Sequence, residues 1–396
     1  MSFLDKYIKV GFIDNKKRPV DREILLRQLA LASGGHPRSI EYIISSCNYY
    51  TGILGIEEIL NNAALKFSLK YPQDKNFQQL LNAVLLGETV NGDDLLVGGD
   101  PKSESYRSLV KRGVLVDSFD DETGLSFIPT APELYLYQWA LNKQLNAEVR
   151  FFLKQILNAR YKFTPLKFEK IHSSWEQLMR YVRQGNPKYE RIPLNELYHM
   201  KLRYGAAPAA SCLVDGQSIL KDIQYIKDTN ITLHPNTIYD PKDINNPGWD
   251  RLIVLEIFEV SAEGNTRERY LLPLFIKNKF SREDATTVLS VAEVKSANDI
   301  CKKFMENRVS FGSGFAPLPT VADNFVLIVV ARWNSHGTVF TDSPSNVITC
   351  VDEDLERLYG PTLKGLVNSL QPDTSITVGT PRIATSTSKA SNLSTQ

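Results

Sequence analysis

The sequence predicts an α/β protein with a helical first part and a second part built on a mixed sheet flanked by helices. Two observations predict this class. In the first part, apolar residues recur with helical spacing, as in Asp21–Ala32. After residue 250 the chain instead alternates long apolar runs, such as Leu252–Val260 and Asn324–Ala331, with helical segments. Because those runs are nearly continuous, we expect their strands to be covered on both faces.

Composition sets the limits within which a function has to be sought. The chain has 396 residues, enough for two or three domains, and a formal net charge of +1. Any site for a polyanion must therefore be local, and no overall charge favours a membrane. The four cysteines show no CxxC or short Cys/His spacing, which predicts neither a disulfide framework nor a zinc site. No secretion signal and no membrane-spanning apolar run is expected.

In the first part, the helix Asp21–Ala32 should end at Ser33–Gly35, and a second helix should begin near Pro37. Further helices are expected near 56–69 and 76–86, followed by a helix and strand within 105–116, joined at Gly113, and a returning strand at 125–129. Helices followed by a two-stranded wing predict a winged-helix module. We expect this module to pack against a neighbouring domain or a protein partner rather than to bind DNA.

The second part opens with a long β-hairpin formed by Leu252–Val260 and Tyr270–Phe280. If Gly264–Asn265 is the centre of its turn, antiparallel pairing sets Asp250 opposite Lys279. A carboxylate and an ammonium group then share one site, as metal-dependent nucleases require. An ordinary cross-strand ion pair remains an equal alternative.

The remaining elements follow from caps and apolar runs. A helix is predicted over Ser281–Asn307, with Ser281 as its cap, then a glycine-rich loop at 309–315, strands at 324–331 and 346–351, and a helix at 352–370. The loop has no following Lys-Ser/Thr, so it is not a phosphate-binding P-loop. The Ser/Thr-rich tail 371–396 is expected to be disordered.

Basic and aromatic residues are concentrated between Arg150 and Tyr204. Twelve Lys/Arg stand there against four Glu, a local excess of eight positive charges. Aromatic residues lie among these cations, a composition that suits a surface that follows a phosphate backbone. The alternative is a pair of amphipathic helices with their aromatic residues in the core.

Two short motifs resemble known families. Ser33-Gly-Gly-His-Pro-Arg38 is similar to the lid motif of AAA and STAND-type ATPases. The resemblance implies that Pro37 touches adenine and that Arg38 senses the γ-phosphate. No GxxxxGK[ST] motif or Walker B acid occurs, so the chain is not expected to hydrolyse ATP alone, and a separate chain would have to supply the P-loop.

The second motif combines Tyr239–Asp250 with Phe275–Ser281, and it resembles the PD-(D/E)xK nuclease domain of Crinkler and retrotransposon-hotspot proteins. The resemblance implies a restriction-endonuclease-like sheet, with Asp250, Lys277 and Lys279 at the catalytic positions. Lys277 stands where the family carries Glu, Asp or Gln. A protonated lysine cannot ligate Mg²⁺.

By the same resemblance, Glu196 on an opening helix is the candidate for a second ligand of Mg²⁺ or Mn²⁺ beside Asp250, and His199 lies on the same helical face. Glu256 and Glu259 are alternatives that the sequence does not rank. The expected function is a Mg²⁺-dependent DNA endonuclease. The alternative is a catalytically decayed module that binds nucleic acid or another protein, because an added cation favours phosphate over metal.

These expectations divide the chain into four parts. Residues 1–145 form the lid-like and winged-helix region, 146–190 a basic helical connector, 191–370 the nuclease-like domain and 371–396 the tail. The resemblance also implies an effector-like protein that acts on DNA in a nucleus, that of a host cell included.

Overall fold

The computed structural model describes residues 26, 29–30, 32–34, 37–49, 56–66, 74–96, 103–119, 125–143, 145–159, 165–198, 212–226, 230–241, 246–260, 267–280, 290–332, 344–351, 354–355 and 358–360. The expectations for the side chain of Arg38, for His199, for the cap at Ser281 and for the tail 371–396 lie outside these residues. Most of the predicted helix 352–370 does so as well.

The helical part follows the predicted order. Its helices are α3 (Pro37–Tyr49), α4 (Ile56–Lys66), α5 (Asp74–Leu86), α6 (Tyr106–Lys111), α7 (Glu133–Leu141) and α8 (Ala147–Ala159). Gly34 has a φ of +61°, a left-handed conformation that glycine adopts without strain, and α3 begins at Pro37. The predicted break and restart at these two residues are thus confirmed.

A small antiparallel sheet follows α6. Its strands are β1 (Val90–Asn91), β2 (Val116–Phe119) and β3 (Ser126–Thr130), in the order β1-β3-β2. Ser105 caps α6 by accepting a hydrogen bond from the amide of Ser108, and Gly113, with a φ of +71°, turns the chain toward β2. The predicted helix, strand and returning strand are therefore present.

The main sheet contains the predicted hairpin. Its central strands lie in the order β8 (Thr237–Pro241), β9 (Arg251–Val260), β10 (Arg267–Phe280), β13 (Val326–Arg332) and β14 (Val347–Val351). The first three strands are antiparallel, whereas β13 and β14 run parallel to β10. A parallel pair needs a crossover, and α12 (Val291–Arg308) supplies it between β10 and β13.

Shorter strands extend this sheet. Strand β6 (Lys221–Ile226) pairs with β8, β5 (Leu213–Val214) pairs with β9 and with β4 (Ile192–Pro193), and β12 (Ala316–Pro317) pairs with β10. Strands β7 (Ile231–Leu233) and β11 (Val309–Phe311) form a separate parallel pair. The start of the glycine-rich segment 309–315 is thus a strand, where the sequence predicted only a loop.

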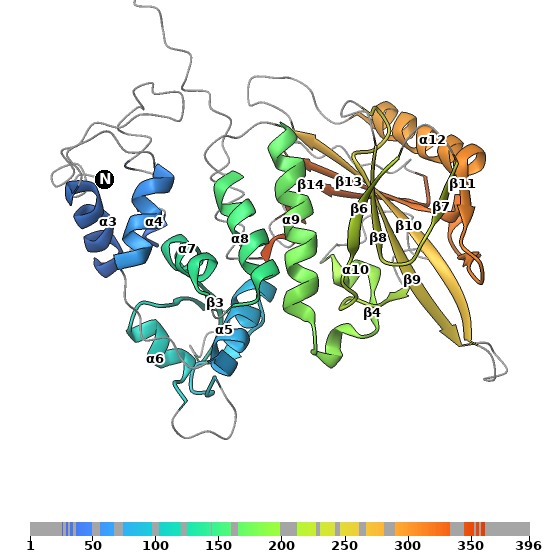
Figure 1. Ribbon diagram of the computed structural model, residues 1–396. Helices are drawn as coiled ribbons and strands as arrows, with labels where there is room; N and C mark the ends of the chain where they lie inside the picture. Colours follow the sequence, from blue (N-terminus) through green and yellow to red (C-terminus); the bar gives the residue numbers. More distant parts are fainter. Residues whose placement is uncertain are drawn as a thin grey trace, which may run out of the picture.

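Helices cover both faces of the sheet (Figure 1). Alternate residues of β9 point to opposite faces. Ile253 and Leu255 belong to one core cluster with Trp175 of α9 (Pro165–Arg183), whereas Leu252 and Val254 belong to a second cluster with residues of α12 such as Cys301. The prediction of strands covered on both faces is confirmed. Helix α9 also packs on α5 and α8, so it stands between the helical part and the sheet (Figure 1).

Helix α12 begins later than predicted. Its first residue is Val291, and Ser290 caps it in a reciprocal arrangement with Glu293: the hydroxyl of Ser290 accepts from the amide of Glu293, and the carboxylate of Glu293 accepts from the amide of Ser290. This capping box satisfies two amide groups that the helix cannot pair itself. Residue 290 therefore marks the start of the described helix.

Part of the basic, aromatic segment lies in the protein interior rather than on a phosphate-binding surface. Trp175, Tyr189 and Tyr198 are buried, and so are Arg180 and Arg183. Buried rings cannot stack on bases. The expectation of a phosphate-tracking surface is therefore wrong for these residues, because amphipathic burial on α9 prevails.

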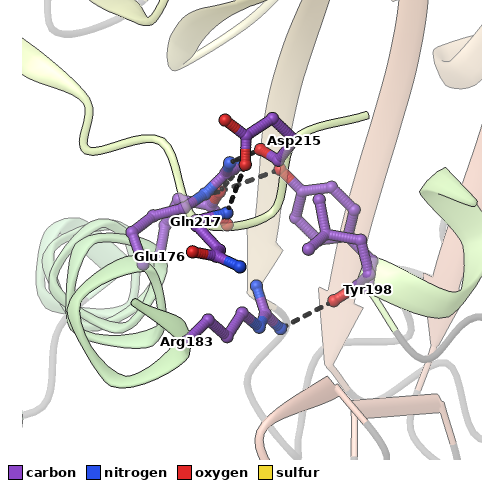
Figure 2. Close-up of polar contacts among 7 residues, drawn as sticks. Glu176, Arg183, Tyr198, Asp215 and Gln217 are labelled. Carbon is purple, nitrogen blue, oxygen red and sulfur yellow. Dashed lines mark hydrogen bonds and ion pairs between the residues drawn. The ribbon is translucent and has the colours of Figure 1, made fainter. Parts of the chain in front are cut away.

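The two buried arginines enter a polar cluster at the C-terminal end of α9, and Figure 2 labels Arg183, Glu176, Tyr198 and Asp215 in it. Arg180 donates to the carboxylate of Glu176 at 3.0 Å and to the carbonyl of Asp215 at 2.9 Å. The Tyr198 hydroxyl donates to the same Glu176 oxygen, and Arg183 donates to the carbonyl of Leu197 at 2.8 Å. These bonds fix α9 to two segments that follow it, the end of α10 (Leu194–Leu197) and the loop after β5.

Candidate functional site

The candidate site lies where β9 begins and β10 ends. Asp250 immediately precedes β9, and its amide donates at 2.8 Å to the carbonyl of Ile276, the residue that pairs with Arg251, which holds Asp250 at the end of β10. The N-terminal end of α9 lies at the same end of the sheet (Figure 1). Two strands and one helix thus bring chain segments far apart in the sequence to one place.

The register of the hairpin sets which lysine meets Asp250. Arg251 pairs with Ile276, so the next pair is Asp250 with Lys277. The prediction that Asp250 lies opposite Lys279 is wrong by one step of two residues. The midpoint of the observed pairing lies one residue earlier in the chain than Gly264–Asn265. Because the slip is even, both lysines stay on the predicted face of the sheet.

Asp250 has two close partners. Its Oδ1 accepts from the Nζ of Lys277 at 3.0 Å, and its Oδ2 accepts from the amide of Asn278. Lys277 also donates to the carbonyl of Asn246 at 3.0 Å. Burial raises the pKa of Asp250 above its usual range, although Lys277 and the Asn278 amide favour the charged form.

Lys279 pairs with a different acid. Its Nζ lies 2.5 Å from Oε1 of Glu293, on the first turn of α12. Partial burial raises the pKa of Glu293, but the bonds from Lys279 and Ser290 outweigh it and bring the pKa below its ordinary value. Lys279 is thus tied to the capping box of α12 rather than to Asp250.

A third carboxylate was missed by the sequence analysis. Glu169 lies in the second turn of α9, and its pKa is raised to about 7, first by burial and second by the negative charge of Asp250. The charges of Lys277 and Arg251 oppose this effect. In the sequence, Glu169 is marked only as an acid near the start of a basic helix that precedes the sheet. The family resemblance pointed to Glu196 instead.

On the α9 face of the sheet, Asp240 and Arg251 form a two-point ion pair. Nε and Nη2 of Arg251 lie 2.7 Å from the two oxygens of Asp240. Both side chains are mostly buried, and planar pairs of this kind hold their geometry well. Arg251 is therefore fixed beside Asp250 and near Glu169.

Glu196 does not join this group. It is exposed on α10, directly after β4, which connects through β5 to Ile257 of β9. Ile257 is seven residues from Asp250, or about 23 Å along a strand. The charge of Asp250 acts on Glu169 of α9 instead, so the choice of Glu196 as a partner of Asp250 is corrected. The alternative Glu256 pairs with Arg269 at 2.7 Å, far along the same strand.

The residues at this site do not form a ready metal centre. Among the described residues, no group of three or more His, Cys, Asp or Glu side chains is placed to hold a metal ion. Each oxygen of Asp250 already accepts a hydrogen bond, and the ammonium group of Lys277 lies against Oδ1, where a cation would bind. The present arrangement does not fit Mg²⁺ or Mn²⁺, because Lys277 itself supplies the positive charge.

At the other predicted site, Pro37 is exposed at the first position of α3. The contacts of Pro37 and Arg38 with adenine and phosphate stay predictions.

In comparisons with known proteins, no family model, curated protein or solved structure matches the chain. None of the helices in the described ranges is long and apolar enough to cross a membrane.

Proposed function

We propose that this protein binds nucleic acid through a nuclease-type site in which a lysine has replaced the metal ion. The observation that carries the proposal is the contact between Lys277 and Asp250, with Nζ and Oδ1 3.0 Å apart. In this arrangement the charge that would face a phosphate is a fixed ammonium group. Binding then does not depend on a divalent cation, and the diester is held without being cut.

The order of elements supports the nuclease-type origin. Helix α9, the antiparallel strands β8, β9 and β10, the crossover α12 and the parallel strand β13 come in this order along the chain, with shorter elements such as α10 and β5 between them. The resemblance to PD-(D/E)xK domains implies a mixed sheet flanked by helices, with the metal-binding aspartate and the catalytic lysine on its hairpin. Asp250 and Lys277–Lys279 occupy those positions.

Local charge supports binding of a phosphate rather than its hydrolysis. Lys170 is exposed on α9 beside Glu169, and the side chain of Lys279 is 32% exposed. The positive end of the α9 dipole lies at the same end of the sheet (Figure 1). Cations held in fixed positions near a helix N-terminus favour a phosphate backbone.

The test is binding of labelled oligonucleotides, measured by fluorescence anisotropy over a range of salt concentrations. We expect affinity to fall steeply with salt and to be the same in EDTA and in Mg²⁺. Lys277→Ala should weaken binding about tenfold, because it leaves the charge of Asp250 facing the phosphate. The matched control is Lys303→Ala, an exposed lysine elsewhere on α12, which should bind as the parent does. No binding by the parent, or binding that requires Mg²⁺, contradicts the proposal.

A Mg²⁺-dependent DNA endonuclease is the second candidate, and the position of Glu169 favours it. Burial and, second, the charge of Asp250 raise the pKa of Glu169, so the two carboxylates lie near enough to interact at one end of the sheet. A nick or cut in plasmid DNA by the parent protein with Mg²⁺ or Mn²⁺, lost in Asp250→Ala, supports this candidate.

The variant Lys277→Glu separates the two candidates. It restores the acid that the resemblance places at this position. If Lys277 has replaced the metal, the variant should gain Mn²⁺-dependent cleavage that the parent lacks. If the parent already cleaves and the variant loses activity, Lys277 is part of a working site. Glu196→Gln is the control, since Glu196 lies away from Asp250 and should change neither result.

The resemblance adds further parts to the proposal. The β1-β3-β2 sheet with α6 would form the winged-helix region, in contact with a protein partner. Pro37, at the start of α3, would form part of a nucleotide site only if a separate chain supplied the P-loop. A nuclear, effector-like role also belongs here, and localisation of the tagged protein in cells tests it.

A further inference from the structure

Tyr225 is an unusually exposed aromatic residue near the candidate site. Its relative exposure is 67%, and it lies on β6, which pairs with β8 and, among the described strands, with no other. Large aromatic side chains are normally mostly buried, because each one that is exposed leaves apolar area in water. Its exposure therefore calls for a physical reason.

The register of the sheet connects Tyr225 to the site. Tyr225 pairs with Asp240 on β8, and Asp240 is bound to Arg251 on β9. Residues paired across neighbouring strands project from the same face, so Tyr225, Asp240 and Arg251 form a row across three strands. The row lies on the α9 face, since Arg251 alternates with Leu252 and shares its side with Ile253. At about 4.8 Å between strands, the row is about 10 Å long.

The row combines two kinds of contact. The ring of Tyr225 offers an exposed π-face. The guanidinium group of Arg251 is fixed by Asp240, whose two oxygens accept one hydrogen bond from Nε and one from Nη2. The other three N–H groups of Arg251 have no acceptor among the described residues. A flat, partly polar ligand that stacks on a ring and accepts hydrogen bonds from its edge fits this combination. An unpaired nucleobase is such a ligand, whereas a base inside a duplex has no free face.

We propose that Tyr225 is a stacking platform for an unpaired base, and that the preferred ligand is single-stranded nucleic acid running past the ends of β8 and β9. The inference rests on the proposed function and names its substrate class. The lysines at the end of β10 lie on the α12 face, so the backbone of the strand would pass around the strand ends while the base lies on Tyr225, on the α9 face.

The experiment compares two labelled oligonucleotides of equal length, a single-stranded DNA and the same strand with abasic sites, by fluorescence anisotropy. Tyr225→Ala should bind the normal strand about tenfold more weakly than the parent does. It should bind the abasic strand as the parent does, because the phosphate contacts are unchanged. Tyr225→Phe keeps the ring and should retain parental affinity, which shows that the loss is not one of folding.

Phe151 on α8 provides the matched control, with a relative exposure of 57% and a position on the helical part. Phe151→Ala should leave both affinities unchanged. The inference is overturned if Tyr225→Ala binds the normal strand as the parent does, or if it loses equal affinity for both strands. Should the parent bind neither strand, the proposed function itself fails and the inference falls with it.

Discussion

At the scale of single residues, the candidate site is a set of charges held by particular partners. Lys277 neutralises Asp250, Lys279 neutralises Glu293, and Arg251 neutralises Asp240. Glu169 has no such partner among the ion pairs of the described residues, and burial raises its pKa. Its protonation is therefore the charge change at this site that falls near neutral pH.

The raised pKa of Glu169 predicts a pH-dependent stability. An unfolded Glu ionises near pH 4.5 and the folded residue near pH 7, so the native state holds an extra proton between these values. The free energy of unfolding should consequently fall as pH rises from 4.5 to 7. Glu169→Gln removes this loss and should be more stable than the parent above pH 7, by about 1 kcal/mol after screening by solvent.

Urea unfolding of parent and variant at several pH values checks this expectation. The difference in unfolding free energy should grow between pH 5 and pH 7 and then stay constant. Glu196→Gln, exposed on α10, is the control for a general effect of removing a carboxylate. A constant difference at all pH values would show that the ionisation of Glu169 is not linked to folding.

At the scale of elements, the loop before β9 holds Asp250 in place. The Asn246 side chain accepts from the amides of Gly248 and Trp249, at 2.9 and 3.5 Å. The ring of Trp249 packs edge-on against Phe275 of β10 and Phe304 of α12, with 5.3 Å between centroids in each pair. The segment 246–249 is thus packed between β10 and α12.

Gly248 is the position where this packing leaves no room. A Cβ there would lie 2.5 Å from Cγ2 of Ile300 on α12, which no side chain tolerates without movement. Gly248→Ala should lower the free energy of unfolding by about 1–3 kcal/mol and displace Asp250. Ile300→Ala removes Cγ2, the closest clashing atom, and leaves only its Cβ at 2.9 Å, so in the double variant the two losses should not add fully. Thermal unfolding of the four proteins measures this coupling, and simple additivity would contradict the contact.

At the scale of the whole molecule, the spacing of apolar residues and the alternation of side chains along strands predict most of the fold. The apolar runs at 252–260 and 324–331 gave strands covered on both faces, and Gly34 and Pro37 gave a helix break and restart. The face on which Asp250 and the lysines lie followed from alternation alone. These features are local, and local chemistry decides them.

What the sequence could not predict depends on distant contacts. Turn composition does not fix a hairpin register to within two residues, which is why Lys279 was chosen in place of Lys277. The choice of Glu196 over Glu169 failed because it depends on which helix packs against the strand ends. The arginines of α9 were assigned to the surface because their partners, Glu176 and the carbonyl groups of Leu197 and Asp215, come from three different segments.

Helix α9 has one further consequence. Glu169 and Arg183 are fourteen residues apart, about 21 Å along a stiff helical rod. Arg183 is clamped between a carbonyl and the Tyr189 ring, while the Tyr189 hydroxyl reaches Glu88 beyond α5. The C-terminal end of α9 is therefore anchored, through Tyr189, to Glu88 of the helical part. We expect a displacement of Arg183 to be passed along this helix to Glu169, beside the strand ends.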